Sequence, residues 1–118
     1  MDGGGVFDVL GRCDVSGVVK VTQGVGAILC CSHHDQVRKQ LHGHTYEVTA
    51  WFSFKESRDA LCLQKTLEGA LSAWDHTVLP DELASAEGLA TAILGLLNGC
   101  VEVEVSRPLE RLYARARV

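Results

Sequence analysis

The chain lacks the sequence features that are typical of nucleic-acid-binding proteins and of membrane-spanning proteins. It contains no basic stripe with interleaved aromatic residues, and its formal net charge is −4, so a nucleic-acid partner is not expected. No apolar stretch reaches the length of a transmembrane helix, and the first residues, Met1 to Gly5, lack the basic start of a signal peptide. We therefore expect a cytoplasmic protein that binds neither nucleic acid nor membrane.

The cysteines also lack a recognisable pattern. Five are present, an odd number, and no two of them form a Cys-x-x-Cys pair. Without a secretory signal, reduced thiols are the expected state, and most of the five are expected to be small core residues. Cys30 and Cys31 differ because they lie just before a pair of histidines, so these two thiols are candidates for a chemical role.

Hydrophobic patterns predict one α+β domain. With 118 residues, of which 47% are hydrophobic, the chain fits a single domain with one core. Residues 1–24, which begin glycine-rich, are expected to be an N-terminal extension that is partly flexible or forms a short hairpin. Residues 25–118 are expected to contain, in order, strands over 25–33 and 42–54, a helix over 63–74, a helix between Ser85 and Asn98, and strands over 100–106 and 112–118.

Histidines gather around the start of the second predicted strand. His42 and His44 lie two positions apart, and alternate residues of a strand point to the same face, so both imidazoles can reach one ion. Neutral imidazole suits zinc, and a catalytic zinc usually takes three protein ligands and keeps one open position. We expect the third ligand to come from the adjacent pair His33 and His34.

Four short motifs follow one another along the chain. They are Cys31-Ser32-His33, His42-Gly43-His44, Asp75-His76, and the segment Ala84 to Ala90 at the start of the second predicted helix. In this order they resemble the 6-pyruvoyl-tetrahydropterin synthase and 6-carboxytetrahydropterin synthase family over about residues 25–118. The resemblance implies the tunnelling fold (T-fold), in which four-stranded antiparallel sheets with two helices on one face, ordered ββααββ, assemble side by side. It also implies a homo-oligomer, commonly a hexamer, with active sites between subunits.

The resemblance further implies a zinc-dependent lyase or cyclase with a small-molecule substrate, in that family dihydroneopterin triphosphate. Zinc would act as a Lewis acid on adjacent oxygens of the substrate. Its ligands would be His33, His42 and His44. His34 is the alternative to His33, because a slip of one residue exchanges the faces of a strand. The pair Asp75–His76 would move protons, with the carboxylate orienting the imidazole and favouring its charged form.

Two positions depart from the family pattern. The family's catalytic cysteine stands four residues before the first histidine of His-Gly-His, and Arg38 occupies that position here. The register of the family's pterin-anchoring glutamate falls on Arg107, while Glu104 and Glu110 lie nearby but out of register. A substrate other than the usual one is therefore expected, either a pterin or another hydroxy-ketone or carboxylate.

Several roles stay open at this point. The base that removes a substrate proton is His76, His34 or Cys31, and Arg38 either clamps an anionic group or lies in a solvated loop. The alternative to an enzyme is a non-catalytic, zinc-binding family member that acts as an assembly or binding subunit. A structural zinc normally has four protein ligands, and Cys31 would then be the fourth. A third alternative is an unrelated fold with chance motifs.

Overall fold

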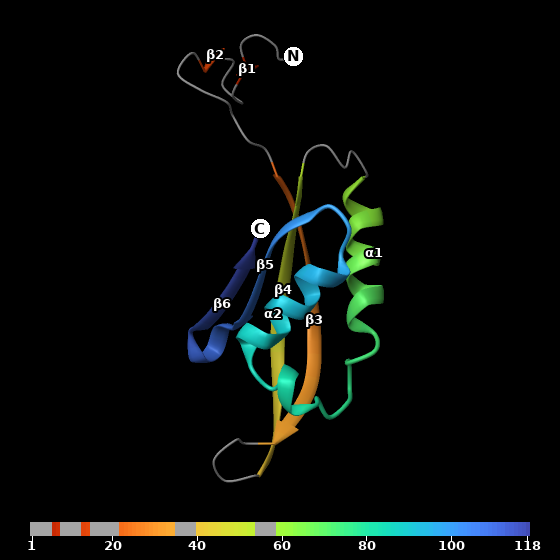
Figure 1. Cartoon of the computed structure of the whole chain (residues 1–118), viewed down its shortest axis with the longest axis vertical. Coiled ribbons are helices and arrows are strands. Elements are labelled where there is room, and N and C mark those ends of the chain that lie inside the picture. Colours follow the sequence, from red (N-terminus) through yellow and green to blue (C-terminus); the bar gives the residue numbers. More distant parts are fainter. Residues whose placement is uncertain (1–5, 8–12, 15–21, 35–39, 54–58) are drawn as a thin grey trace.

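A computed structural model describes residues 6–7, 13–14, 22–34, 40–53 and 59–118. In this part of the chain, one four-stranded antiparallel sheet is covered on one face by two helices (Figure 1). The sheet and its helices comprise β3 (Thr22–His34), β4 (Leu41–Ser53), α1 (Ala60–Leu71), α2 (Ala86–Leu96), β5 (Cys100–Arg107) and β6 (Leu112–Arg117). Short 3₁₀ turns, η2 (Asp81–Leu83) and η3 (Pro108–Glu110), precede α2 and β6. The predicted fold class, with its order ββααββ, is confirmed.

The strands follow one another across the sheet in the order β3-β4-β5-β6. Along β4 every second side chain from Tyr46 to Phe52 is buried, because this row faces the helices. In β3 the same face carries Val25, Leu29 and Cys31, as the alternation in the sequence predicts. The opposite face is largely exposed, and Ile28 on it is 56% exposed.

Both helices begin at a side-chain cap. The Asp59 carboxylate accepts a hydrogen bond from the backbone N–H of Cys62, so α1 starts three residues before the predicted boundary. The predicted cap of α2 is confirmed, since the Ser85 hydroxyl accepts from the N–H of Gly88 at 3.0 Å. α1 ends at Leu71, and Trp74, predicted as its last apolar residue, lies in the following turn against the core.

The segment that follows α1 lies along the free edge of β3. The Cys30 carbonyl accepts from the N–H of His76, Ser32 N–H donates to the Thr77 carbonyl at 2.9 Å, and the Ser32 carbonyl accepts from Leu79 N–H at 2.7 Å. The two bonds of Ser32 pair it with Val78 in a parallel β-bridge. The edge of β3 therefore fixes where Asp75 and His76 lie.

The N-terminal region is described at two places, β1 (Val6–Phe7) and β2 (Cys13–Asp14), which pair antiparallel. β3 begins at Thr22, three residues before the expected start of the domain. The turn expected near Ser16 and the loop position Arg38 lie outside the described residues. No helix in the described part of the chain is long and apolar enough to cross a membrane.

Candidate functional site

Three histidines lie together at one end of the sheet, on the face that the helices cover. The β3–β4 register places His33 opposite His42, and Cys31 opposite His44. The ring centroids of His33 and His44 are 4.7 Å apart, and those of His42 and His44 are 6.2 Å apart. Tyr46, the next residue of the row, is 2% exposed, so the imidazoles continue the buried row just beyond the core.

This cluster has the dimensions and the chemistry of a zinc site. Three imidazoles on one tetrahedral zinc would have ring centroids about 5 Å apart, given Zn–N bonds of about 2.0 Å. His33 Nδ1 lies 3.1 Å from the carbonyl oxygen of His34, an arrangement that leaves Nε2 for a metal. Burial lowers the pKa of His44, and Arg107 and the two neighbouring histidines lower it further, which favours the neutral, metal-binding form.

His34 and Cys31, the two residues next to the cluster in β3, face opposite sides of the sheet. His34 is exposed and lies on the face opposite His33, so its side chain is not part of the cluster. Cys31 lies on the histidine face and is 7% exposed. Burial, together with the charges of Cys30 and Asp75, raises the pKa of Cys31 to about 11. Its thiol is therefore protonated at neutral pH, and the structure gives it a packing role.

Asp75 and His76 form an ion pair at the edge of β3. Asp75 Oδ2 lies 3.0 Å from His76 Nδ1, and Asp75 Oδ1 accepts from the backbone N–H of Cys30 at 3.0 Å. The bond from Cys30, and then those from His76, hold the pKa of Asp75 below its usual range. His76 adopts φ 61°, a conformation that residues with a Cβ rarely adopt. Its side chain is 79% exposed.

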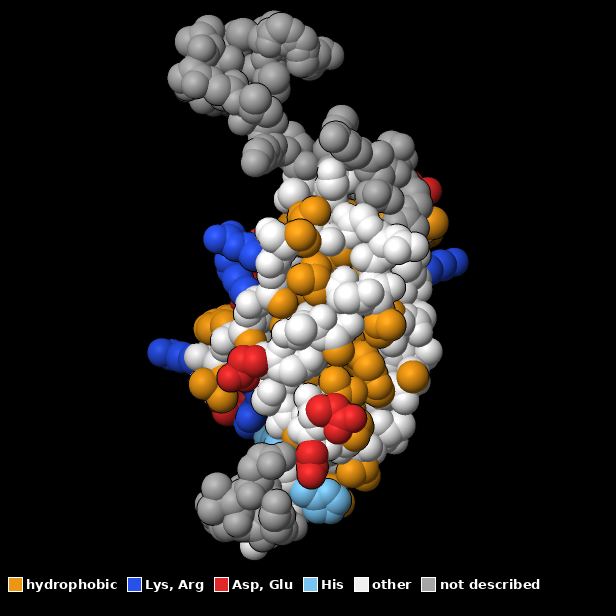
Figure 2. All heavy atoms as spheres, in the orientation of Figure 1, with side chains coloured by type: hydrophobic (Ala, Val, Ile, Leu, Met, Phe, Trp, Pro, Cys, Tyr) orange, Lys and Arg blue, Asp and Glu red, His pale blue; other side chains and the backbone are white. Residues whose placement is uncertain are grey.

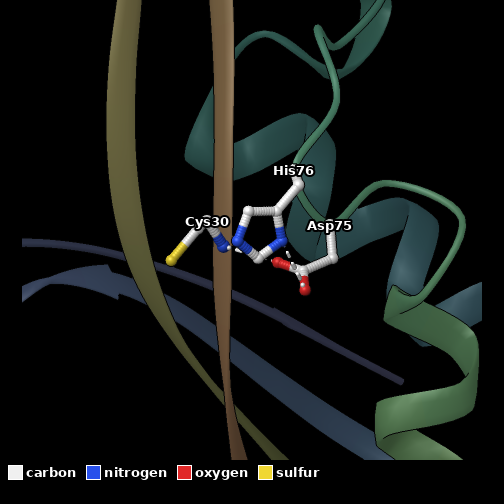
Figure 3. Close-up of side chains that lie close together, drawn as sticks. All are labelled: Cys30, Asp75 and His76. Carbon is white, nitrogen blue, oxygen red and sulfur yellow. Dashed lines mark hydrogen bonds and ion pairs between the residues drawn. The ribbon is translucent and has the colours of Figure 1, made fainter.

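The structure brings Cys30, one of the two thiols that the sequence marked as candidates for a chemical role, next to this pair. The Cys30 sulfur, a carboxylate oxygen of Asp75 and a ring nitrogen of His76 all lie within 4.8 Å of one another (Figure 3). Cys30 precedes Cys31 and therefore faces the other side of the sheet. The alternation of β3 could have predicted the face of Cys30. Cys30 and His33 are three positions apart in the strand, so their side chains point to opposite faces. The approach of Asp75, 45 residues later, could not be predicted from the alternation.

The two groups therefore lie on opposite faces of the same end of the sheet. A cavity of about 480 Å³ beside His76 is lined by residues of β3, β4 and the segment after α1, among them Cys30, Ser32, Thr45 and Val78. The family resemblance predicted that the three histidines and the Asp75–His76 pair act in one mechanism. The alternation of β3 and β4 turns the histidine side chains to the face opposite Cys30, although His44 lines this cavity together with His76.

Arg107 and Glu110 border the histidine end of the sheet. Arg107 Nε lies 3.2 Å from Glu110 Oε1, and both side chains line a cavity of about 350 Å³ with His44. The turn η3 brings Glu110 back to this cavity, which the strand register could not predict. Glu104 instead faces the other side of the sheet and lies 3.6 Å from Arg115. The carboxylate of Glu110, which lies out of register in the sequence, thus stands near the position that the register gives to Arg107.

Histidine and acidic side chains gather at this end of the molecule. In the view of Figure 2, histidine side chains show at the lower end, beside acidic side chains, while Lys and Arg side chains lie on the flanks. The lower end is also where β3 ends and β4 begins in Figure 1. Imidazole and carboxylate groups, which bind metals and transfer protons, therefore lie at the end of the sheet that also holds the two cavities lined by His44.

Comparison with known proteins shows a similarity of fold. No protein-family model matches the chain, and no curated protein matches its sequence. Among solved structures, 6-pyruvoyl tetrahydropterin synthase of Caenorhabditis elegans is similar, with a TM-score of 0.67 and 14% sequence identity. The match covers 85% of this chain and 96% of that chain. At this identity the similarity shows the fold, and the chain has the T-fold of that synthase.

Proposed function

We propose that this chain is a zinc-dependent lyase or cyclase that acts on a small molecule, on a scaffold shared with the pterin synthase. The observation that carries the proposal is the cluster of His33, His42 and His44 on one face at the end of the sheet. The row that these partly buried rings continue is otherwise apolar apart from the hydroxyl of Tyr46. Three polar rings in the row beyond Tyr46 support a ligand-binding role.

Each of these histidines would bind zinc through one neutral ring nitrogen. The His34 carbonyl would hold His33 in the tautomer that presents Nε2, and the electrostatic surroundings of His44 would keep that ring uncharged. Zinc, when bound, supplies Lewis-acid chemistry that acidifies a C–H next to a coordinated oxygen. The cysteine role of the related family would not be filled by Cys31, whose thiol is buried and protonated.

The proton-transfer group would be Asp75–His76, contributed by a second copy of the chain. In one chain the side chains of His33 and His42 lie on the face opposite this pair, and only His44 shares a cavity with His76, so the pair of another copy is better placed to serve the cluster. A homo-oligomer that brings the edge of β3 of one copy to the histidine end of another would complete the site. Asp75, held ionised, would orient His76 Nδ1–H and stabilise the charged imidazole after proton transfer.

The substrate would present acceptor atoms to Arg107 and donor atoms to Glu110. A guanidinium carries only donors, and its Nε is already directed at Glu110, so its terminal nitrogens are the groups that would meet a ligand. A carboxylate such as Glu110 accepts hydrogen bonds from N–H or O–H groups. This pattern supports a hydroxy-ketone or carboxylate, or a pterin bound with one edge toward each side chain.

Zinc content tests the first part of the proposal. We expect the purified protein to bind one zinc per chain, measured by inductively coupled plasma mass spectrometry after dialysis. His42→Ala should lose most of this zinc, because two neutral imidazoles hold the ion much more weakly than three. His34→Ala is the matched control, since it removes a histidine from the other face and should keep its zinc. Full zinc occupancy in His42→Ala would refute the ligand assignment.

Turnover tests the second part. The zinc-loaded protein is incubated with dihydroneopterin triphosphate, and the products are identified by mass spectrometry. Formation of a pyruvoyl- or carboxy-tetrahydropterin that disappears in His76→Asn would support the proposed reaction. Zinc binding without any conversion of this substrate, or of other hydroxy-ketones and carboxylates, would contradict an enzymatic role and favour a zinc-holding assembly subunit.

A further inference from the structure

The cluster of Cys30, Asp75 and His76 has an internal order that a chance group of exposed side chains would lack. Asp75 uses one oxygen for the N–H of Cys30 and the other for Nδ1 of His76. The N–H of His76 in turn donates to the carbonyl of Cys30. Both polar groups of the Cys30 backbone are therefore used to fix the carboxylate and the imidazole beside the Cys30 side chain.

The imidazole is turned toward the strand. Figure 3 shows the His76 ring between Asp75 and β3, with one nitrogen directed at the carboxylate and the other on the side of Cys30. Because Nδ1 pairs with Asp75, Nε2 is the nitrogen that can accept a proton. The left-handed conformation of His76 is the conformation that allows both the backbone bond to Cys30 and this orientation of the ring.

The thiol is accessible and has a second polar neighbour. Cys30 is partly exposed on the face opposite the histidine cluster, and its sulfur lies 3.9 Å from the hydroxyl oxygen of Thr45 across the β3–β4 pair. Both residues line the cavity of about 480 Å³ beside His76. A thiolate formed there would have a hydroxyl donor on one side and the imidazolium on the other.

We propose that Cys30 is a nucleophilic thiol, with His76 as its base and Asp75 as the residue that positions the base. The thiol points to the face of β3 away from the histidine side chains, and its reactivity would not depend on zinc, although His44 lines the same cavity. Its ligand would be a small molecule with an electrophilic carbon that fits the cavity. The sulfur forms a bond to that carbon, the leaving group departs with its bonding electrons, and the thiol proton passes to Nε2 of His76.

Alkylation by iodoacetamide tests the proposal on the full chain, with each cysteine followed by peptide mass spectrometry. Here the new bond is S–C and the leaving group is iodide. Cys62, exposed in α1, is an internal reference thiol, and the buried Cys31 is an unreactive one. At pH 7 we expect Cys30 to be alkylated several-fold faster than Cys62, because the imidazole of His76 can take the thiol proton as the S–C bond forms. A Cys30 rate no higher than that of Cys62 would overturn the proposal without any variant.

Substitutions identify the base. His76→Asn removes the imidazole and keeps a residue that tolerates the left-handed conformation. We expect it to slow alkylation of Cys30 at pH 7 by roughly tenfold, since an unassisted thiol is only a few per cent ionised there. Cys62 in the same sample should change little. His34→Asn is the matched control, because it removes a histidine from the same face of β3 away from the thiol. An unchanged Cys30 rate in His76→Asn would refute the role of His76.

The outcome is distinguishable from that of the proposed function. His42→Ala is expected to lose zinc and to keep the fast alkylation of Cys30. Loss of Cys30 reactivity in that variant would mean that the thiol depends on the metal site, against the proposal. Conversely, a protein with no zinc and no turnover that still shows the Cys30 reactivity would retain this inference and reject only the lyase.

Discussion

Gly88 gives a prediction whose sign contradicts helix propensity. It lies within α2, where replacing an ordinary helical glycine with alanine would stabilise the helix by about 1 kcal/mol. At this position, however, an added Cβ would lie 2.6 Å from the backbone carbonyl oxygen of Glu82 in η2 and 3.2 Å from Ser85 Oγ. The oxygen belongs to the backbone of a tight turn, so the contact cannot be relieved by rotating a side chain.

The expected size of the effect follows from these two contributions. Overpacking of a tight contact costs about 1–3 kcal/mol, and the gain in helix propensity offsets at most about 1 kcal/mol. With the full offset, we expect Gly88→Ala to lower the free energy of unfolding by up to about 2 kcal/mol. The same substitution at Gly95, later in the same helix, would meet no atom within 4 Å and should be neutral or stabilising.

Urea unfolding followed by circular dichroism measures both variants against the natural chain. A difference of about 1–3 kcal/mol between Gly88→Ala and Gly95→Ala is expected, with Gly88→Ala the less stable. In thermal unfolding this corresponds to roughly 4 °C for each kcal/mol in a domain of this size. Equal stabilisation by the two substitutions would refute the reasoning, because it would mean that η2 moves away from α2 without cost.

Two further predictions concern the core and the edge of β3. Leu67→Ala should lower the free energy of unfolding by about 2–5 kcal/mol, because this side chain is fully buried in α1, while Leu61→Ala, 61% exposed in the same helix, should change it little. Equal losses in the two variants would contradict the packing of α1. The pKa of Asp75 is lower in the folded protein than its ordinary value of 3.8. Its ionised form therefore stabilises the fold at pH values above 3.8, and this contribution is lost as the pH falls through the lower pKa of the folded state. The stability difference between the natural chain and Asp75→Asn should therefore be present at pH 7 and shrink below pH 3.8, as measured by urea unfolding across pH; a pH-independent difference would argue against the bonds to Asp75.

The sequence predicted those features that depend on local patterns. Alternation along 25–33 correctly assigned the residues of β3 that face the helices, and the two-residue spacing correctly put His42 and His44 on one face. The choice of His33 over His34 came from the family resemblance, and the structure places His33 beside His44. The cap at Ser85 followed from residue type and position alone. The start of α1 was missed because Asp59 ends a charged segment that resembles a turn, although its carboxylate caps the helix.

Features that depend on long-range contacts could not be predicted in this way. The position of Asp75 and His76 is set by backbone bonds to Cys30 and Ser32, and no local signal gives a pairing between a strand and a turn more than 40 residues later. The return of Glu110 to the histidine end depends on the geometry of η3, which brings the chain out of the strand register. The chemistry of the candidate site therefore arises from the fold as much as from the motifs.

The covered edge of β3 also limits how the sheet can grow. Cys30 and Ser32 have their outward backbone groups bonded to residues 76–79 and to Asp75, and the Gly26 carbonyl accepts from the Gln64 side chain at 3.0 Å. A strand from another molecule could not form a continuous ladder along this edge. Among the described strands, β6 (Leu112–Arg117) is the other edge of the sheet. Templated addition of a strand, whether in ordered assembly or in aggregation, is thus directed to β6.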